Sequence, residues 1–173
     1  MLQGRLLLNY GGRFECISFL MDAKAKMEKL KVLFLCTGNS CRSQMAEGWA
    51  TKLKSDTIVA YSAGIDPHGM NDSAVKVMQE AGVDMRNHHS KHLDELKDIQ
   101  FDYVVTVCDH ANESCPLFHG KTKVVHVGFD DPPRLAKGAR TEQEALGHYR
   151  RVRDEIRVFV ESIEEHLPEG RLR

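Results

Sequence analysis

Residues 31–43, KVLFLCTGNSCRS, decide the fold. They begin with a near-continuous apolar run that ends at Cys36, which predicts a strand buried on both faces of a sheet. Residues 43–54 then carry apolar side chains at helical spacing, namely Met45, Ala46, Trp49, Ala50 and Leu53. A buried strand, a short polar loop and a helix in this order are typical of the first unit of a parallel sheet in an α/β protein.

The rest of the chain continues this alternation of strands and helices. Further strands are predicted at residues 57–63, 102–108 and 123–128, and helices at residues 72–81, 93–99 and from 141 onward. The last helix opens with the spacing of a capping box, Thr141 and Glu144. Its apolar residues recur at helical spacing: Leu146, Tyr149, Val152, Ile156, Phe159, Val160 and Ile163. Residues 129–140 contain two prolines and are expected to form a loop. The pattern predicts a three-layer α/β/α fold around a four-stranded parallel sheet.

Length and composition narrow the class of protein. The chain has 173 residues, of which 42% are hydrophobic, with 24 basic and 25 acidic side chains. The length fits one domain, and the hydrophobic content excludes global disorder. A net charge of −1 gives no basic surface for nucleic acid, and no apolar stretch is long enough to span a membrane. No apolar stripe is left unassigned, so we expect a monomer.

Residues 1–26 differ from the rest of the chain, because polar residues and glycines interrupt their apolar run at Leu6–Leu8. They show no clear secretory signal. We expect residues 1–26 to form a poorly ordered N-terminal extension and residues 27–173 to form a single catalytic domain. Five cysteines in 173 residues are too few for a disulfide scaffold, which favours a reducing, cytoplasmic setting.

The loop at residues 36–43 combines the features of an oxyanion site. Its backbone N–H groups can surround one tetrahedral anion, which the start of the following helix also attracts. The Arg42 guanidinium can bind two anion oxygens. The same positive field is expected to favour the thiolate of Cys36, with the Ser43 hydroxyl as its hydrogen-bond partner. The residues expected to bind the anion are Thr37, Gly38, Asn39, Ser40, Cys41, Arg42 and Ser43.

The sequence CTGNSCRS, followed by MAEG at residues 45–48, resembles the catalytic loop of the low-molecular-weight protein tyrosine phosphatase superfamily. Within that superfamily the chain is most similar to the thioredoxin-coupled arsenate reductases, over about residues 31–167. The resemblance implies a sheet with strand order 2-1-3-4. It also implies reduction of arsenate to arsenite, in arsenic detoxification, with no bound cofactor and with electrons from thioredoxin. Phosphate or sulfate would compete with arsenate for the loop.

Two further cysteines distinguish the reductases from the phosphatases of this superfamily. Cys108 ends a predicted strand, and the segment between it and Cys115 is short, polar and free of proline, so it can rearrange. Disulfide exchange requires sulfur atoms to meet in sequence, so such mobility would serve a redox relay. The resemblance implies that Cys36, Cys108 and Cys115 are the three redox cysteines. Cys41 is expected to be a packing residue, and Cys16 is given no role.

Other interpretations of the cysteine pair stay open from the sequence. The two thiols could be unrelated buried cysteines, or they could bind zinc with His110, His119 or His126. Their spacing is wider than that of a usual zinc knuckle, and the chain has no second such pair.

Residues 129–133, FDDPP, follow the fourth predicted strand. By resemblance Asp131, rather than Asp130, is the general acid that protonates the leaving oxygen. From the residues alone, turn formation would be the better interpretation of two aspartates before a proline. The phosphatases usually carry tyrosines just after this Asp-Pro, whereas Pro133 and Arg134 follow here. This difference favours a small inorganic oxyanion as the substrate.

A potassium ion stiffens the loop in related reductases, held by side chains that match Asn39, Glu47 and Ser62. A further ligand of the family, an aspartate, falls at Lys91. We therefore expect the Lys91 ammonium to pair with Glu47 in place of the cation, and we expect no potassium requirement. The nearby histidines are expected to be solvated on a surface turn: His88, His89 and His92.

Two other functions stay open. A protein tyrosine phosphatase would need Cys36, Arg42 and Asp131 but neither Cys108 nor Cys115. A non-enzymatic thiol redox sensor or zinc-binding regulator would keep the cysteine pair without depending on Arg42 or Asp131.

Overall fold

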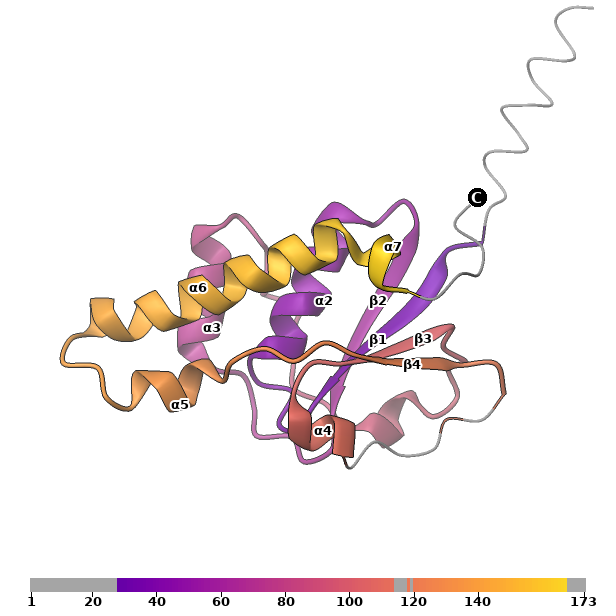
Figure 1. Ribbon diagram of the computed structural model, residues 1–173, viewed down its shortest axis with the longest axis horizontal. Helices are drawn as coiled ribbons and strands as arrows, with labels where there is room; N and C mark the ends of the chain where they lie inside the picture. Colours follow the sequence, from indigo (N-terminus) through magenta and orange to yellow (C-terminus); the bar gives the residue numbers. More distant parts are fainter. Residues whose placement is uncertain (1–27, 114–117, 119, 168–173) are drawn as a thin grey trace, which may run out of the picture.

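The computed structural model describes residues 28–113, 118 and 120–167 (Figure 1). In chain order its elements are β1 (Leu30–Cys36), α2 (Arg42–Leu53), β2 (Ile58–Gly64), α3 (Asp72–Glu80), the 3-10 helix η1 (Leu93–Leu96), β3 (Tyr103–Thr106), α4 (Asp109–Glu113), β4 (Lys123–His126), α5 (Pro132–Ala136), α6 (Glu142–Glu161) and α7 (Ile163–His166). The predicted extension at residues 1–26 lies outside the described residues, and so does Cys115.

The four strands form one parallel sheet in the order β2-β1-β3-β4, which confirms the predicted fold and strand order. The register pairs Cys36 at the end of β1 with Gly64 at the end of β2, and Leu35 with Thr106 of β3. The carboxyl ends of the strands therefore share one edge of the sheet. Ligand sites of parallel sheets lie at this edge, and the loop that follows Cys36 begins there.

Strand β1 is buried on both faces, as its apolar run predicts, and Val32, Leu33, Phe34 and Leu35 are fully buried. Helix α2 packs against β1 and β2 and under α6, whereas α4 lies against β1 and β3 (Figure 1). The connections from β1 to β2 and from β3 to β4 run in opposite directions along the sheet. Right-handed crossovers therefore place α2 and α4 on opposite faces.

The apolar stripes of the helices form most of the predicted core. All seven apolar residues predicted for the last helix are buried, six in α6 and Ile163 in α7. In α2, Met45, Ala46, Trp49 and Ala50 are buried, whereas Leu53 at the end of the helix is 36% exposed.

Only half of the predicted capping box forms. The Thr141 side chain accepts a hydrogen bond from the Glu144 N–H, but the Glu144 carboxylate accepts one from the Arg140 N–H instead of from Thr141. The one-sided cap still marks the start of α6, because it pairs one of the helix's first N–H groups.

Several element boundaries differ from the prediction. The expected loop at residues 129–140 contains helix α5, because Asp131 accepts a hydrogen bond from the Arg134 N–H as its N-cap. Its two prolines stand in the first turn, where a helix has no need of their missing N–H groups. The strand expected at residues 102–108 ends at Thr106, and helix α4 begins at Asp109. The helix expected at residues 93–99 is a single 3-10 turn, η1.

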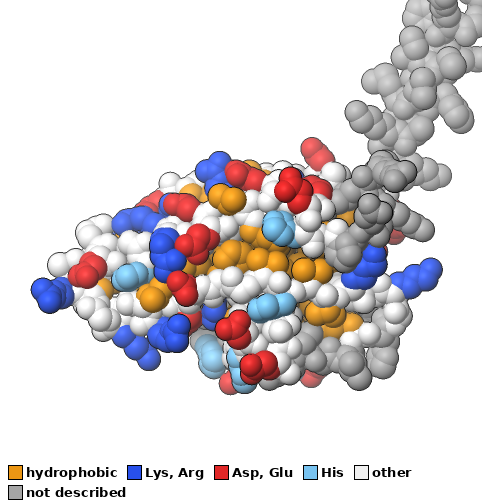
Figure 2. Space-filling view, in the orientation of Figure 1, with side chains coloured by type: hydrophobic (Ala, Val, Ile, Leu, Met, Phe, Trp, Pro, Cys, Tyr) orange, Lys and Arg blue, Asp and Glu red, His pale blue; other side chains and the backbone are white. Residues whose placement is uncertain are grey.

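The visible face of the molecule carries acidic and basic side chains interspersed over α6 and its surroundings (Figure 2). This distribution agrees with the net charge of −1. Within the part of the chain that the structure describes, no helix is long and apolar enough to cross a membrane.

Candidate active site

The segment from Cys36 to Ser43, here called the anion loop, connects β1 to α2. Each carbonyl oxygen from position 36 to position 41 accepts a hydrogen bond from a donor elsewhere in the chain: Ile65 N (3.3 Å), Asp66 N (2.9 Å), His68 N (3.0 Å), Gln44 Nε2 (3.2 Å), Asn71 N (3.0 Å) and Met45 N (2.9 Å), respectively. The C=O and N–H groups of a trans peptide point in opposite directions. Because these donors hold the carbonyl groups on the outside of the loop, the N–H groups point toward its inside. This arrangement binds a tetrahedral anion.

The loop passes very close to the end of β2, where Gly64 stands. A Cβ atom at Gly64 would lie 2.7 Å from the Thr37 carbonyl oxygen and 2.9 Å from the Asn39 nitrogen. Asn39 itself has a positive φ of 44°, which asparagine tolerates better than most residues. The tight turn of the loop thus depends on the residue types at both positions.

The Cys36 thiol is buried at the base of the anion loop. Its Sγ lies 2.9 Å from the Ser43 Oγ and accepts a hydrogen bond of 3.2 Å from the Asn39 N–H. Burial raises the pKa of this thiol, and the hydrogen bonds from Ser43 and Asn39 act in the opposite direction without reversing the shift. The net shift is therefore opposite to the one expected from the sequence, because a charge at this depth loses its hydration.

A buried polar cluster fixes the orientation of the Ser43 hydroxyl. The Asn39 amide nitrogen donates to Ser43 Oγ (2.9 Å) and to Ser62 Oγ (2.8 Å), and Ser62 donates to Glu47 Oε2 at 2.5 Å. Since the Ser43 oxygen accepts from Asn39, its own hydrogen can be donated to Cys36. The cluster thereby orients a donor toward the nucleophile.

Glu47 lies at the far end of this cluster beside basic side chains. Lys91 Nζ is 3.6 Å from Glu47 Oε2, the pairing expected from the sequence. The His88 ring is not on a solvated turn, since its side chain is only 13% exposed and its Nδ1 is 2.9 Å from Gln44 Oε1. Burial lowers the pKa of His88.

Arg42 and Asp131 meet at the mouth of the loop. Arg42 Nη2 lies 3.0 Å from Asp131 Oδ1, and Arg42 Nη1 donates to the Phe129 carbonyl at 2.9 Å. The neighbouring Asp130 is directed elsewhere, because Arg151 of α6 binds it at 2.8 Å and holds its pKa below the usual range. Of the two aspartates, Asp131 is the one in contact with the anion loop.

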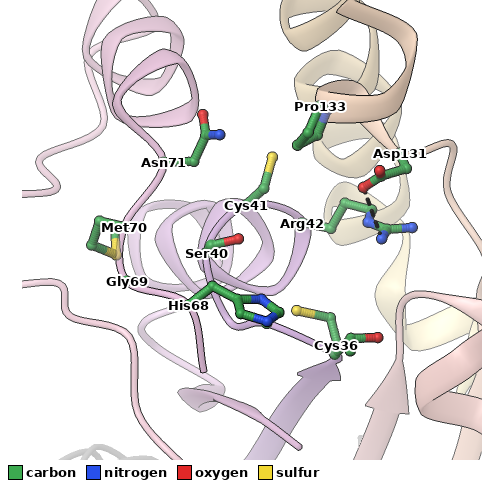
Figure 3. Close-up of a pocket in the computed structure, with 12 residues that line it drawn as sticks. Cys36, Ser40, Cys41, Arg42, His68, Gly69, Met70, Asn71, Asp131 and Pro133 are labelled. Atoms are coloured by element: carbon green, nitrogen blue, oxygen red, sulfur yellow. Dashed lines mark ion pairs between the residues drawn. The ribbon is translucent and has the colours of Figure 1, made fainter. Parts of the chain in front are cut away.

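An open cavity of about 470 Å³ lies over the anion loop, with Cys36 at its base (Figure 3). Part of its lining was predicted, namely Cys36, Thr37, Gly38, Ser40, Cys41, Arg42 and Asp131. Pro133 lines the cavity beside Asp131 (Figure 3). The opposite wall was not predicted from the sequence, and it consists of His68, Gly69, Met70 and Asn71. These residues belong to no motif and reach the cavity only because residues 65–71 run along the loop. Their one available signal was position, since they directly follow the end of a strand at the ligand-binding edge.

The second cysteine lies beside the anion loop, next to another cavity. Cys108 Sγ is 3.5 Å from Thr37 Oγ1, and Cys108 is buried. It lines a cavity of about 490 Å³ that also touches Arg42 and Asp131. Cys115 lies outside the described residues. Burial strongly raises the pKa of Cys41, which agrees with a packing role for that thiol.

The described residues contain no group of three or more His, Cys, Asp or Glu side chains that could hold a metal ion. His126, one of the candidate zinc ligands, instead contacts Thr106 and Asp109. His119 lies outside the described residues.

Comparison with known proteins agrees with this geometry. Residues 31–169 match the family described as low molecular weight phosphotyrosine protein phosphatase. An arsenate reductase of Bacillus subtilis (strain 168) is 50% identical over 130 residues, which cover 75% of this chain and 91% of that protein.

Two solved structures illustrate the two classes of protein that share the fold. One, "An arsenate reductase in the phosphate binding state", has a TM-score of 0.60 and 25% identity, covering 80% of this chain and 99% of its own. The other is a low molecular weight protein tyrosine phosphatase from T. tengcongensis, with a TM-score of 0.59 and 27% identity, covering 80% of this chain and 100% of its own. With its sheet order, its anion loop and these matches, the chain belongs to the low molecular weight phosphotyrosine protein phosphatase family.

Proposed function

We propose that this protein is an arsenate reductase that uses a three-cysteine relay. The observation that carries the proposal is the position of Cys108, whose sulfur lies 3.5 Å from Thr37 Oγ1 and therefore beside the loop that begins at Cys36. Hydrolysis of a phosphate ester has no use for a second thiol at this place, whereas reduction of a bound oxyanion requires one. The similarity to curated arsenate reductases, at 43–50% identity, supports the same conclusion.

The first step joins sulfur to arsenic. Arsenate binds to the N–H groups of the anion loop and to Arg42, and the Cys36 thiolate attacks arsenic. An S–As bond forms and one As–O bond breaks, and the departing oxygen leaves as water after receiving a proton from Asp131. The Ser43 hydroxyl and the Asn39 N–H stabilise the thiolate before the attack.

The second step transfers two electrons. The Cys108 thiolate attacks Cys36 Sγ, an S–S bond forms, and the S–As bonding pair stays on arsenic, which leaves as arsenite. In the third step the Cys115 thiolate attacks Cys108 Sγ, which releases the Cys36 thiolate and leaves a Cys108–Cys115 disulfide. A dithiol protein of the thioredoxin class then reduces this disulfide, so the cycle needs no bound cofactor.

Potassium is not part of this proposal, because the residues that would hold it are engaged by hydrogen-bond donors. Glu47 Oε2 accepts from Ser62 and faces the Lys91 ammonium, and Asn39 Oδ1 accepts from the Gln44 side chain and the Lys91 N–H. A potassium ion would need these oxygen lone pairs for itself. The Lys91 ammonium supplies the positive charge at this place.

A coupled assay tests the function. The purified protein is mixed with thioredoxin, thioredoxin reductase and NADPH, arsenate is added, and NADPH loss is followed. We expect turnover in the wild type and none in Cys36→Ser or Cys115→Ser. Absence of turnover in the wild type would refute the reductase, and full turnover in Cys115→Ser would refute the relay. Aryl phosphate hydrolysis, measured in parallel, would reveal a dominant phosphatase if it proceeded much faster than arsenate reduction.

A further inference from the structure

Residues 65–71, here called the strap, run along the anion loop, and residues 68–71 of the strap form the wall of the cavity opposite Arg42. The N–H groups of the strap hold the carbonyls at positions 36, 37, 38 and 40 of the anion loop. The strap therefore has a defined position relative to the oxyanion site. One strap side chain, that of His68, carries an ionisable ring into the cavity (Figure 3).

The His68 ring lies directly against the anion loop. A Cβ atom at Gly38 would be 2.3 Å from His68 Nδ1, so the ring occupies the space that any side chain at position 38 would need. In Figure 3 the ring points from the strap toward Cys36. On the other side of the ring, His68 Nε2 lies 3.4 Å from Asp66 Oδ2. The two side chains form an ion pair when the ring is protonated, and Nδ1 lies on the side of the loop.

The protonation state of the ring determines what Nδ1 presents to the loop. Protonated His68 presents an N–H donor and a positive charge to the loop side, which the neutral ring does not combine. Histidine changes its charge between about pH 5 and pH 8, unlike the other residue types on this wall.

Given the other charged groups around the cavity, the charge of His68 decides the net charge of the wall opposite Arg42. Arg42 is paired with Asp131 at 3.0 Å, so these two groups nearly cancel each other as seen from the opposite wall. Asp66 adds a negative charge, and the thiols of Cys36 and Cys41 are the remaining ionisable groups. Protonation of His68 therefore determines whether the wall opposite Arg42 attracts or repels an anion.

The cavity also leaves room for such a contact. Its volume of about 470 Å³ far exceeds that of one tetrahedral oxyanion, so an anion seated in the loop has oxygen atoms that face outward into the cavity. These outward oxygens need donors other than the loop N–H groups, and His68 Nδ1 is on the side of the ring that faces the loop.

We propose that His68 is a substrate-positioning residue that, when protonated, donates from Nδ1 to an outward oxygen of the bound oxyanion and makes anion affinity dependent on pH. The proposal rests on the proposed function in one respect, that the anion loop binds an oxyanion. It does not depend on the cysteine relay.

Sulfate is the probe for the test, because its charge stays constant over the pH range in question. The full-length protein is treated with iodoacetamide at pH 6 and pH 8, and the dissociation constant of sulfate is obtained from its protection of Cys36. The variants are His68→Ala, His68→Gln and His68→Lys, and the matched control is His148→Gln on α6. Far-ultraviolet circular dichroism confirms that each variant is folded.

At pH 6 we expect His68→Ala and His68→Gln to bind sulfate about fivefold more weakly than the wild type, the order of one partly exposed charge-assisted hydrogen bond. At pH 8 this difference should vanish, while His68→Lys should bind more tightly than the wild type. With arsenate as substrate, His68→Ala should raise KM at pH 6 and leave kcat within about twofold.

Three results would overturn the proposal. An equal loss of sulfate affinity in His68→Ala at both pH values would indicate a purely structural role for His68. No loss at pH 6 would show that His68 does not contact the bound anion. If His68→Lys did not bind sulfate more tightly than the wild type at pH 8, a positive charge at position 68 would not be what strengthens anion binding. Absence of sulfate protection in every protein, including the wild type, would instead refute the oxyanion site on which the proposed function rests.

Discussion

The nucleophile of this protein is controlled by two opposing effects on a single sulfur atom. Burial raises the pKa of Cys36, and the Ser43 hydroxyl and Asn39 N–H lower it. The Asn39 amide sets the direction of the Ser43 hydrogen bond, so the cluster offsets part of the effect of burial on the thiolate. The thiolate fraction, and with it the reactivity of Cys36, should therefore rise as the pH rises from neutral toward alkaline.

The substitution Ser43→Ala tests this control. It removes a hydrogen bond to a charged sulfur, worth about 1.5–3 kcal/mol, which corresponds to roughly one to two units of pKa. We expect alkylation of Cys36 by iodoacetamide at pH 7 to become at least about tenfold slower, with the pH–rate curve displaced to higher pH. The control Ser162→Ala removes an exposed hydroxyl of the last helices and should leave the curve unchanged. A curve displaced to lower pH in Ser43→Ala would contradict the assignment.

The pairing of Lys91 with Glu47 makes a second prediction. Wild-type activity should be the same in potassium and in choline buffers, because the ammonium already lies beside the carboxylate. Lys91→Asp replaces this cation with a second carboxylate, so we expect activity to fall severalfold in choline and to recover in potassium. Lys97→Asp, on an exposed residue, is the control. Strong potassium stimulation of the wild type would show that the ammonium does not replace the ion.

The elements that support the anion loop were predictable to different degrees. The strand–loop–helix unit at residues 31–53 follows from its apolar pattern, because β1 is buried on both faces and the apolar residues Met45, Ala46, Trp49 and Ala50 of α2 are buried. Helix α5 was missed because two prolines suggest a loop, although prolines also favour a first helical turn. Helix α4 is too short and polar to show a periodicity.

The strap shows the limit of prediction from sequence for the site. His68 is distant in the chain from the anion loop, and no residue pattern connects the two. Only the parallel pairing of β1 with β2 brings the end of β2, and the strap after it, next to the loop. Similarly, the cavity wall around Asn71 depends on backbone hydrogen bonds that leave no trace in residue type.

The junction of β2 with the anion loop can be tested through its glycine. Gly64→Ala should force the loop away, because its Cβ would lie 2.7 Å from the Thr37 carbonyl oxygen. We expect a loss of about 1–3 kcal/mol in the free energy of unfolding and a larger loss of sulfate protection at Cys36. Gly147→Ala on α6 is the matched control, because nothing lies within 4 Å of its Cβ. It should raise stability by up to about 1 kcal/mol, as followed by urea unfolding. Equal effects of the two substitutions would contradict the close approach.

At the scale of the whole molecule, the fold brings two thiols from different strands to one edge of a parallel sheet. Cys36 ends β1, and Cys108 follows β3, which is the neighbour of β1. Two cavities, one over Cys36 and one beside Cys108, share Arg42 and Asp131. In the proposed function the first admits the oxyanion, and the second adjoins the thiol that supplies electrons to the loop and carries the resulting disulfide toward Cys115.

The order of the relay is the central claim, and single-turnover disulfide mapping tests it most directly. Reduced protein is mixed with arsenate in the absence of thioredoxin, the remaining thiols are alkylated, and the disulfides are identified by mass spectrometry. We predict a Cys108–Cys115 disulfide and one arsenite per chain in the wild type, and a trapped Cys36–Cys108 disulfide in Cys115→Ser. Arsenite release from Cys115→Ser with no disulfide between Cys36 and Cys108 would contradict the account.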